Sequence, residues 1–152
     1  MPISEGITAP DFTLPDETGL PRKLSEYRGK PVVLYFYPKD DTPGCTTEAC
    51  SFRDGYGQYQ QAGVVILGVS PDSPKKHTKF KEKYGLPFTL LADENHQVCE
   101  LYGVWGRKKY MGREYDGVFR TTFLIDSQGK ILKVFQNVKP DGHSEQVLAA
   151  LQ

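Results

Sequence analysis

The chain has 152 residues, which fits one domain of ordinary size, 1–152, able to bury a core without disulfides or a structural metal. Lys plus Arg and Asp plus Glu number 19 each, so no global basic field attracts nucleic acid or an acidic membrane surface. The sequence shows neither a secretory signal pattern at its start nor a run of about 18 apolar residues. We therefore expect a cytoplasmic protein without nucleic-acid or membrane partners. Three cysteines are too few for a secreted disulfide scaffold and direct attention to redox chemistry or metal binding.

The first predicted element is a small hairpin or irregular segment, in which the short apolar stretches 11–14 and 20–24 lie among prolines and glycines. Residues 31–37, PVVLYFY, form an apolar run closed by Pro38, which is typical of a central strand buried on both faces. After a polar turn, apolar residues recur at steps of four and three from Cys45 to Tyr59. This spacing predicts a helix with one face on the sheet.

The middle of the chain continues the alternation of strand and helix. Residues 63–70 repeat the buried-strand pattern, and Ser73-Pro74 predicts the start of a helix that runs to about Gly85. Residues 87–93 are expected to form a short strand or loop, and residues 95–102 a short helix. The segment 103–117 is rich in Gly, Lys and Arg, which favours an exposed loop.

The last predicted elements are a β-hairpin and a terminal helix. Residues 118–125 and 130–138 flank a turn at 126–129, and a helix follows from about Ser144. Strands that alternate with helices, plus a late hairpin, predict an α/β fold with a mixed central sheet flanked by helices. The order of elements matches a thioredoxin-like fold with an N-terminal hairpin extension.

The run Thr42-Pro43-Gly44-Cys45 has the pattern of a helix entrance. Thr is a good N-cap and Pro suits the first helical position, so Cys45 falls in the first turn. Unpaired N–H groups and the helix dipole favour a thiolate there, and the carboxyl end of a central strand is where open α/β sheets bind ligands. We interpret Cys45 as a nucleophile. The alternative is an inert cysteine on the apolar side of the helix.

Cys50 lies five residues after Cys45, which is not the Cys-x-x-Cys spacing of a dithiol oxidoreductase. In an intact helix, five residues advance about 7.5 Å and rotate about 140° beyond one turn, so the two thiols point to different sides. A disulfide between them requires unwinding of the helix, which Gly55 and Gly57 would make less costly. The alternative is that Cys50 is a small residue that fills space.

Arg120 lies in the segment 117–125, which is otherwise apolar or β-branched and is predicted as a strand. A buried Arg needs a partner, which is either a carboxylate such as Glu48 or an anion such as a thiolate. A plain ion pair with Glu48 and a contact with the thiolate both remain open. They are also compatible, with Glu48 orienting the guanidinium.

Two further features have structural interpretations that we favour over functional ones. Cys99 follows His96 by three residues, a spacing that metal sites use, but two ligands do not make a site. Core packing or a spare thiol is the favoured account of Cys99. The basic residues 107–109, with Arg113, are favoured as a solvated loop over a docking patch for a reductant.

These motifs together resemble the peroxiredoxins of the AhpC/TSA family, in particular the subgroup called bacterioferritin comigratory protein or peroxiredoxin Q. The resemblance rests on Pro38-x3-Thr42-x2-Cys45, on TTEAC at 46–50, on Trp105-Gly106, on RTTFLID at 120–126 and on APDF at 9–12. It covers nearly the whole chain. It implies a thioredoxin fold and a peroxidase without metal, haem or flavin.

The resemblance also implies a role for each site residue. Cys45 would attack hydrogen peroxide or an organic hydroperoxide, and Cys50 would resolve the sulfenic acid as an intramolecular disulfide that thioredoxin or a similar dithiol reduces. Thr42 would hydrogen-bond the thiolate and the peroxide, Arg120 would hold the anion, and Pro38 would shield the pocket. The cycle needs one chain, so we expect a monomer. The rival functions are a protein dithiol–disulfide oxidoreductase and a non-enzymatic redox sensor or scaffold.

Overall fold

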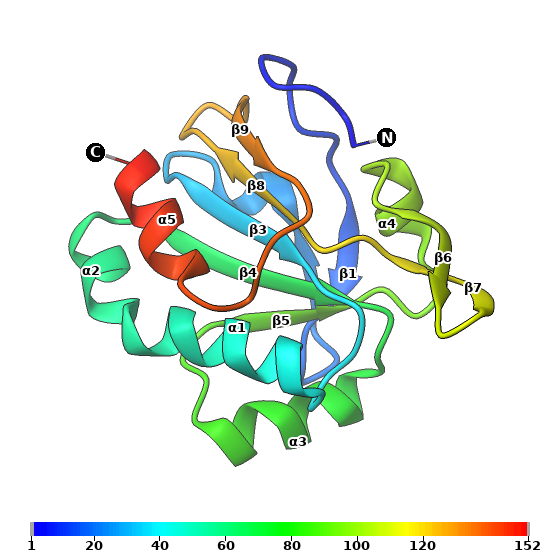
Figure 1. Ribbon diagram of the computed structural model, residues 1–152. Helices are drawn as coiled ribbons and strands as arrows, with labels where there is room; N and C mark the ends of the chain where they lie inside the picture. Colours follow the sequence, from blue (N-terminus) through cyan, green and yellow to red (C-terminus); the bar gives the residue numbers. More distant parts are fainter. Residues whose placement is uncertain (1, 152) are drawn as a thin grey trace.

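The computed structural model describes residues 2–151 and has a central five-stranded mixed sheet in the order β5-β4-β3-β8-β9 (Figure 1). The strands are β3 (Val32–Phe36), β4 (Val65–Ser70), β5 (Thr89–Ala92), β8 (Thr121–Ile125) and β9 (Ile131–Phe135). Strands β3, β4 and β5 run parallel, whereas β8 is antiparallel to both β3 and β9. This arrangement confirms the predicted mixed sheet and the thioredoxin-like fold.

Five α-helices accompany the sheet in the described residues. They are α1 (Pro43–Asp54), α2 (Tyr56–Gln61), α3 (Pro74–Tyr84), α4 (Gln97–Leu101) and α5 (His143–Ala150). Figure 1 shows α1, α2 and α5 over one face of the sheet. Helix α3 begins as predicted, because Ser73 accepts a hydrogen bond from the Lys76 N–H and Pro74 follows it. Among residues 2–151, no helix has both the length and the apolar composition needed to cross a membrane.

Strand β3 is buried on both faces because each face has its own hydrophobic cluster. Val33 and Tyr35 pack against apolar residues of α1, α2, α3 and α5. Leu34 and Phe36 point to the other face, where the N-terminal segment and α4 cover them. The strand therefore has no polar alternation, which is why its sequence is a continuous apolar run.

The predicted helix from Cys45 to Tyr59 is interrupted at Gly55, which ends α1 and precedes α2. A Cβ atom at Gly55 would lie 2.9 Å from Ser144 Oγ, so α5 approaches this position too closely for a side chain. Phe52 and Tyr59 are fully buried, as the spacing predicts. Glycine therefore serves here both to end a helix and to admit a neighbouring one.

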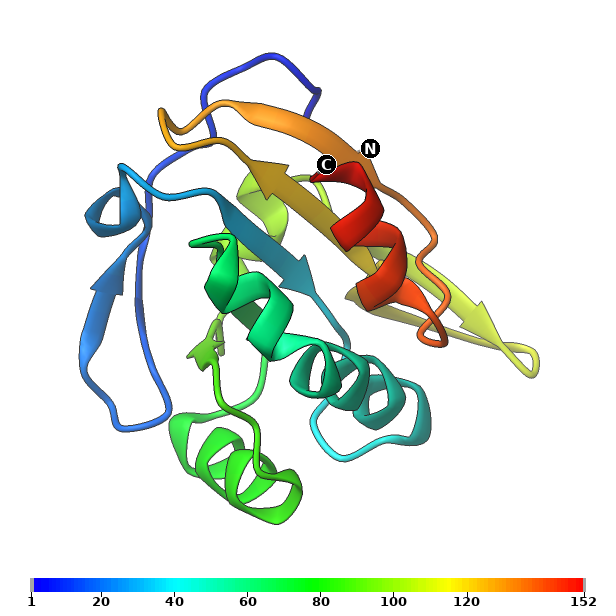
Figure 2. The ribbon, with the colours of Figure 1, turned by 90° about the vertical axis from the view of Figure 1, so that its left-hand side faces the viewer.

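The prediction of an exposed loop at 103–117 was wrong, because the segment forms an antiparallel hairpin of β6 (Trp105–Tyr110) and β7 (Arg113–Val118). Met111 and Gly112 form its two-residue turn, with φ of 51° and 78°, as the twist of a tight hairpin requires. Figure 2 shows the hairpin extending away from the central sheet. Most of its residues are exposed or half-buried, so its strands lack the apolar alternation that identifies a strand in sequence.

The strand predicted from residue 118 begins only at Thr121, so Arg120 lies in a two-residue link rather than within a strand. The backbone of Phe119 and Arg120 forms hydrogen bonds with segments other than β3. The N–H of Phe119 donates to Val104 O at 2.7 Å, and Arg120 O accepts from the Val138 N–H at 3.1 Å. Because Arg120 is not paired with β3, its side chain can reach Cys45 and Glu48 in the N-terminal half of α1.

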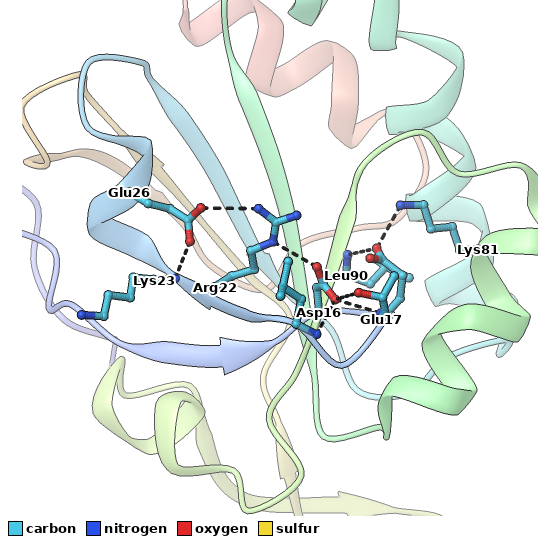
Figure 3. A network of polar contacts seen from close by, with 9 residues as sticks. Asp16, Glu17, Arg22, Lys23, Glu26, Lys81 and Leu90 are labelled. Atoms are coloured by element: carbon cyan, nitrogen blue, oxygen red, sulfur yellow. Dashed lines mark hydrogen bonds and ion pairs between the residues drawn. The ribbon is translucent and has the colours of Figure 1, made fainter.

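The predicted N-terminal hairpin is present as β1 (Thr13–Pro15) and β2 (Pro21–Lys23), followed by the short 3₁₀ helix η1 (Leu24–Tyr27). Asp16 in its turn accepts a hydrogen bond from Arg22 Nε at 3.0 Å (Figure 3). The neighbouring Glu17 carboxylate accepts from Lys81 Nζ at 2.9 Å and from the Leu90 N–H at 3.3 Å (Figure 3). The hairpin therefore fastens α3 to the edge strand β5.

Candidate active site

The thiol of Cys45 lies where the sequence places it, in the first turn of α1 and just beyond the carboxyl end of β3. Thr42 occupies the N-cap position and Pro43 is the first helical residue. Cys45 is 2% exposed and belongs to the hydrophobic cluster between α1 and the sheet. All three cysteines are free thiols. The nucleophile predicted from sequence is thus a reduced thiol, almost completely buried, at the positive end of a helix dipole.

Thr42 has the backbone of an N-cap but not its side-chain hydrogen bond. Its φ and ψ are −102° and 155°, and its Oγ1 donates to Lys39 O at 2.8 Å instead of accepting an N–H of the first turn. The Thr42 oxygen keeps its lone pairs for another donor. No side chain of the described residues caps the first turn, whose N–H groups are available to an anion.

Arg120 contacts both of the partners that the sequence suggested, the Glu48 carboxylate and the Cys45 sulfur. Its Nη1 donates to Glu48 Oε1 at 2.7 Å, and its Nη2 donates to Cys45 Sγ at 3.4 Å. Antiparallel pairing of β8 with β3 brings Arg120 to α1 across 75 residues of sequence. A Cβ atom at Gly44 would lie 3.2 Å from Arg120 Nη2, so the glycine in the first turn of α1 leaves room for the guanidinium.

Burial affects the charges of Glu48 and Arg120 differently. Glu48 is fully buried, and this burial raises the pKa of its carboxyl to about 7, although Arg120 acts in the opposite direction. Burial also opposes the charge of Arg120, but Glu48 and Cys45 raise the pKa of its guanidinium above the ordinary value. Glu48 Oε2 has no hydrogen-bond partner in residues 2–151. Arg120 is thus a permanent cation beside the thiol, and Glu48 changes its charge near neutral pH.

A buried polar cluster that the sequence analysis missed holds the turn before α1. His77 Nδ1 lies 2.6 Å from Asp40 Oδ2, and His77 Nε2 donates to Leu91 O at 2.9 Å. The Asp40 N–H donates to Asp72 Oδ2 at 2.8 Å, and Tyr37 OH donates to Asp40 Oδ1 at 2.5 Å. These polar atoms have protein partners, so the cluster ties the turn to β4, β5 and α3. Asp40 and Asp72 follow two neighbouring parallel strands, a signal that the sequence did contain.

The other two cysteines occupy contrasting environments. Cys50 lies on the intact helix α1 and is half-buried, whereas Cys45 on the same helix faces the core. Cys99 on α4 is fully buried, and burial raises the pKa of its thiol far above the ordinary value. Its neighbour His96 stacks on Trp105 with ring centroids 4.0 Å apart. The environment of Cys99 agrees with the core-packing interpretation.

The basic residues of the β6–β7 hairpin are partly engaged within the hairpin. Arg107 pairs with Asp116 at 3.3 Å. Lys108 is half-buried and donates to Val118 O at 2.8 Å. These contacts lie on strands and not on a solvated loop.

Comparisons with known proteins agree with this geometry. The sequence profile described as the AhpC/TSA family matches residues 6–134. Peroxiredoxin Bcp of Bacillus subtilis is 51% identical over 152 residues, covering 100% of this chain and 97% of the relative. Peroxiredoxin Bcp of Escherichia coli K12 is 50% identical over 147 residues, covering 97% of this chain and 94% of the relative.

Solved structures give the same result. A mutant of PrxQ from Xylella fastidiosa superposes with a TM-score of 0.92 at 35% identity, covering 98% of this chain and 95% of that one. Bacterioferritin comigratory protein of Xanthomonas campestris, a protein with alkyl peroxide reduction activity, superposes with a TM-score of 0.90 at 37% identity, covering 97% of both chains.

Proposed function

The chain belongs to the AhpC/TSA family and is a thiol peroxidase of the peroxiredoxin Bcp type, and from this premise we propose that Cys45 attacks the peroxide. The observation that carries the assignment is the contact of Arg120 with Cys45 Sγ at the head of α1. Cys50 and Cys99 have no comparable cation donating to their sulfur among the described residues.

The first step oxidises Cys45. Its thiolate attacks one oxygen of hydrogen peroxide or an organic hydroperoxide, the O–O bond breaks, and the departing oxygen takes a proton to become water or an alcohol. Cys45 is left as a sulfenic acid. Arg120 and the N–H groups of the first turn stabilise the negative charge as it moves from sulfur to the departing oxygen. Because the Thr42 proton is donated to Lys39 O, we propose that the Thr42 oxygen accepts a hydrogen bond from the peroxide O–H.

Ionisation of the thiol alone does not account for fast peroxide reduction. At pH 7 a thiol of ordinary pKa, about 8.5, is already a few per cent ionised, so complete ionisation accelerates the reaction only about 30-fold. The remaining acceleration must come from donors aimed at the peroxide oxygens in the transition state. Each such donor contributes about 3 kcal/mol, or roughly 10²-fold. We therefore assign Arg120 a role beyond keeping Cys45 ionised.

The second step regenerates the enzyme through Cys50. The Cys50 sulfur attacks the sulfenic sulfur of Cys45, water leaves, and a Cys45–Cys50 disulfide forms. An external dithiol, thioredoxin or a similar protein, then reduces this disulfide by thiol–disulfide exchange. The intact helix between the two cysteines must unwind for the disulfide to form.

Each oxidation and reduction in this cycle takes place at a cysteine sulfur of this chain or of the external dithiol. The proposed cycle therefore requires no metal, haem or flavin in this protein. Both cysteines lie in one chain, and we therefore propose that a monomer suffices for catalysis. We place the protein in the cytoplasm, where the reducing environment keeps its cysteines as thiols.

The test is peroxide consumption coupled to NADPH through thioredoxin and its reductase. Cys45→Ser should abolish turnover, and Cys50→Ser should allow one oxidation but little thioredoxin-supported turnover. Cys99→Ser is the matched control and should retain activity, because Cys99 is buried on α4. Full activity in Cys45→Ser would refute the proposal. Efficient reduction of insulin would favour a dithiol oxidoreductase, and stoichiometric oxidation without turnover would favour a sensor.

A further inference from the structure

The last turn of α3 contacts the turn that leads into α1. Lys83 Nζ donates to Asp41 Oδ2 at 2.9 Å, and Tyr84 OH donates to Asp41 Oδ1 at 2.7 Å. Asp41 has a φ of 57°, in the left-handed region that residues other than glycine rarely adopt. Side-chain contacts with α3 thus accompany an unfavourable backbone conformation at the entrance of the helix that carries Cys45.

Tyr84 of α3 also contacts the C-terminal end of α1. Arg53, in the last turn of α1, donates from Nη1 to Tyr84 O at 2.7 Å. Tyr84 therefore holds Asp41 with its hydroxyl and Arg53 with its carbonyl. Cys45 and Cys50 both lie between these two points of attachment.

Helix α3 is fixed by contacts that do not involve α1. The ring of Phe80 contacts that of Tyr37, directly after β3, with centroids 6.4 Å apart. Thr78 Oγ1 donates to Glu17 O at 2.6 Å. Lys81 Nζ donates to the Glu17 carboxylate (Figure 3). His77 is bonded to Leu91 O of β5. Unwinding of α1 leaves these contacts in place, so α3 is a fixed support for it.

We propose that Tyr84 is a positioning residue that keeps α1 helical around the two cysteines and limits how fast it unwinds after Cys45 is oxidised. This inference rests on the proposed Cys45–Cys50 disulfide. The contacts of Tyr84 belong to the helical arrangement, so they stabilise it relative to the unwound one. They slow the attack of Cys50 on the Cys45 sulfenic acid and lengthen the time during which a second peroxide can oxidise it.

The second oxidation competes directly with disulfide formation. A second peroxide transfers one oxygen to the sulfenic acid, giving sulfinic acid and releasing water or alcohol. A variant that unwinds faster should therefore form more disulfide and less sulfinic acid at the same peroxide concentration. A general loss of folding stability does not by itself change the ratio of disulfide to sulfinic acid. This ratio therefore measures how Tyr84 positions α1.

The experiment follows one turnover of the reduced protein by rapid acid quench and intact-mass spectrometry, without a reductant. Tyr84→Phe and Lys83→Met remove the contacts with Asp41, and Arg53→Met removes the contact at the other end of α1. Tyr110→Phe and Lys75→Met are the matched controls, because both residues are exposed and neither makes a hydrogen bond or ion pair with Asp41 or α1 in the described residues.

We expect disulfide formation to be about two- to fivefold faster in the three α1–α3 variants, the size typical of exposed polar contacts. The sulfinic fraction should fall correspondingly, and the initial oxidation of Cys45 should stay within about twofold of wild type. Disulfide formation in Tyr84→Phe that is no faster than in wild type and Tyr110→Phe would overturn the inference. A wild-type protein that consumes peroxide without forming the Cys45–Cys50 disulfide would instead overturn the proposed function on which it rests.

Discussion

Glu48→Gln is the substitution that most directly tests the electrostatics of the site. Gln has the shape of a protonated Glu and keeps an oxygen that can accept from Arg120 Nη1, but it cannot ionise. The wild-type carboxyl is fully buried, with its second oxygen lacking a hydrogen-bond partner in the described chain. The variant therefore removes one buried titration and little else.

The magnitude follows from the raised pKa of Glu48. In the folded protein this pKa is about 7, against an ordinary value of 4.5, so the folded state holds a proton that the unfolded state releases. Stability from this group is therefore lost as the pH rises from about 4.5 to about 7. The full loss is about 3 kcal/mol, because each tenfold change in proton affinity corresponds to about 1.4 kcal/mol. Gln at the same position has no such loss.

The assay is urea unfolding of both proteins under reducing conditions, followed by circular dichroism at several values between pH 4.5 and pH 8. The unfolding free energy of Glu48→Gln minus that of wild type should increase by about 3 kcal/mol across this range. A constant difference would refute a buried carboxyl with a raised pKa. A difference that decreases with pH would show that the ion pair with Arg120 outweighs burial, which is the reverse of our reasoning.

Three further substitutions test individual contacts. Arg120→Met should lower the rate constant of Cys45 with hydrogen peroxide by about 10²–10³-fold in stopped-flow measurements, and a loss no larger than about 30-fold would contradict a role in the transition state. Thr42→Val keeps the shape but loses the hydroxyl, so the same rate constant should fall about tenfold; an unchanged value would exclude a contact with the peroxide. Cys99→Ala should retain peroxidase activity while losing about 1–2 kcal/mol of unfolding free energy, and in wild type Cys99 should resist alkylation until the protein unfolds.

The sequence determined the features that depend on neighbouring residues along the chain. The apolar run before Pro38 predicts a strand buried on both faces, and β3 is such a strand. The Thr-Pro-Gly-Cys run predicts a helix that begins just before Cys45, and α1 does. Periodicity and capping act within one or two turns, so the sequence alone predicted the type of most elements outside the β6–β7 hairpin and the different environments of Cys45 and Cys50.

The tertiary structure decided which distant residues meet. The hairpin of β6 and β7 was invisible in the sequence because its strands have water on most sides and therefore carry no apolar alternation. The sequence required a partner for Arg120, but only the pairing of β8 with β3 brought its guanidinium to Glu48 and Cys45 together. Contacts such as that of Tyr84 with Asp41 join residues 43 positions apart, and no local pattern encodes them. Local rules placed the thiol at the head of its helix, whereas folding of the whole chain gave it a cation, because strand pairing and helix packing are set by every element at once.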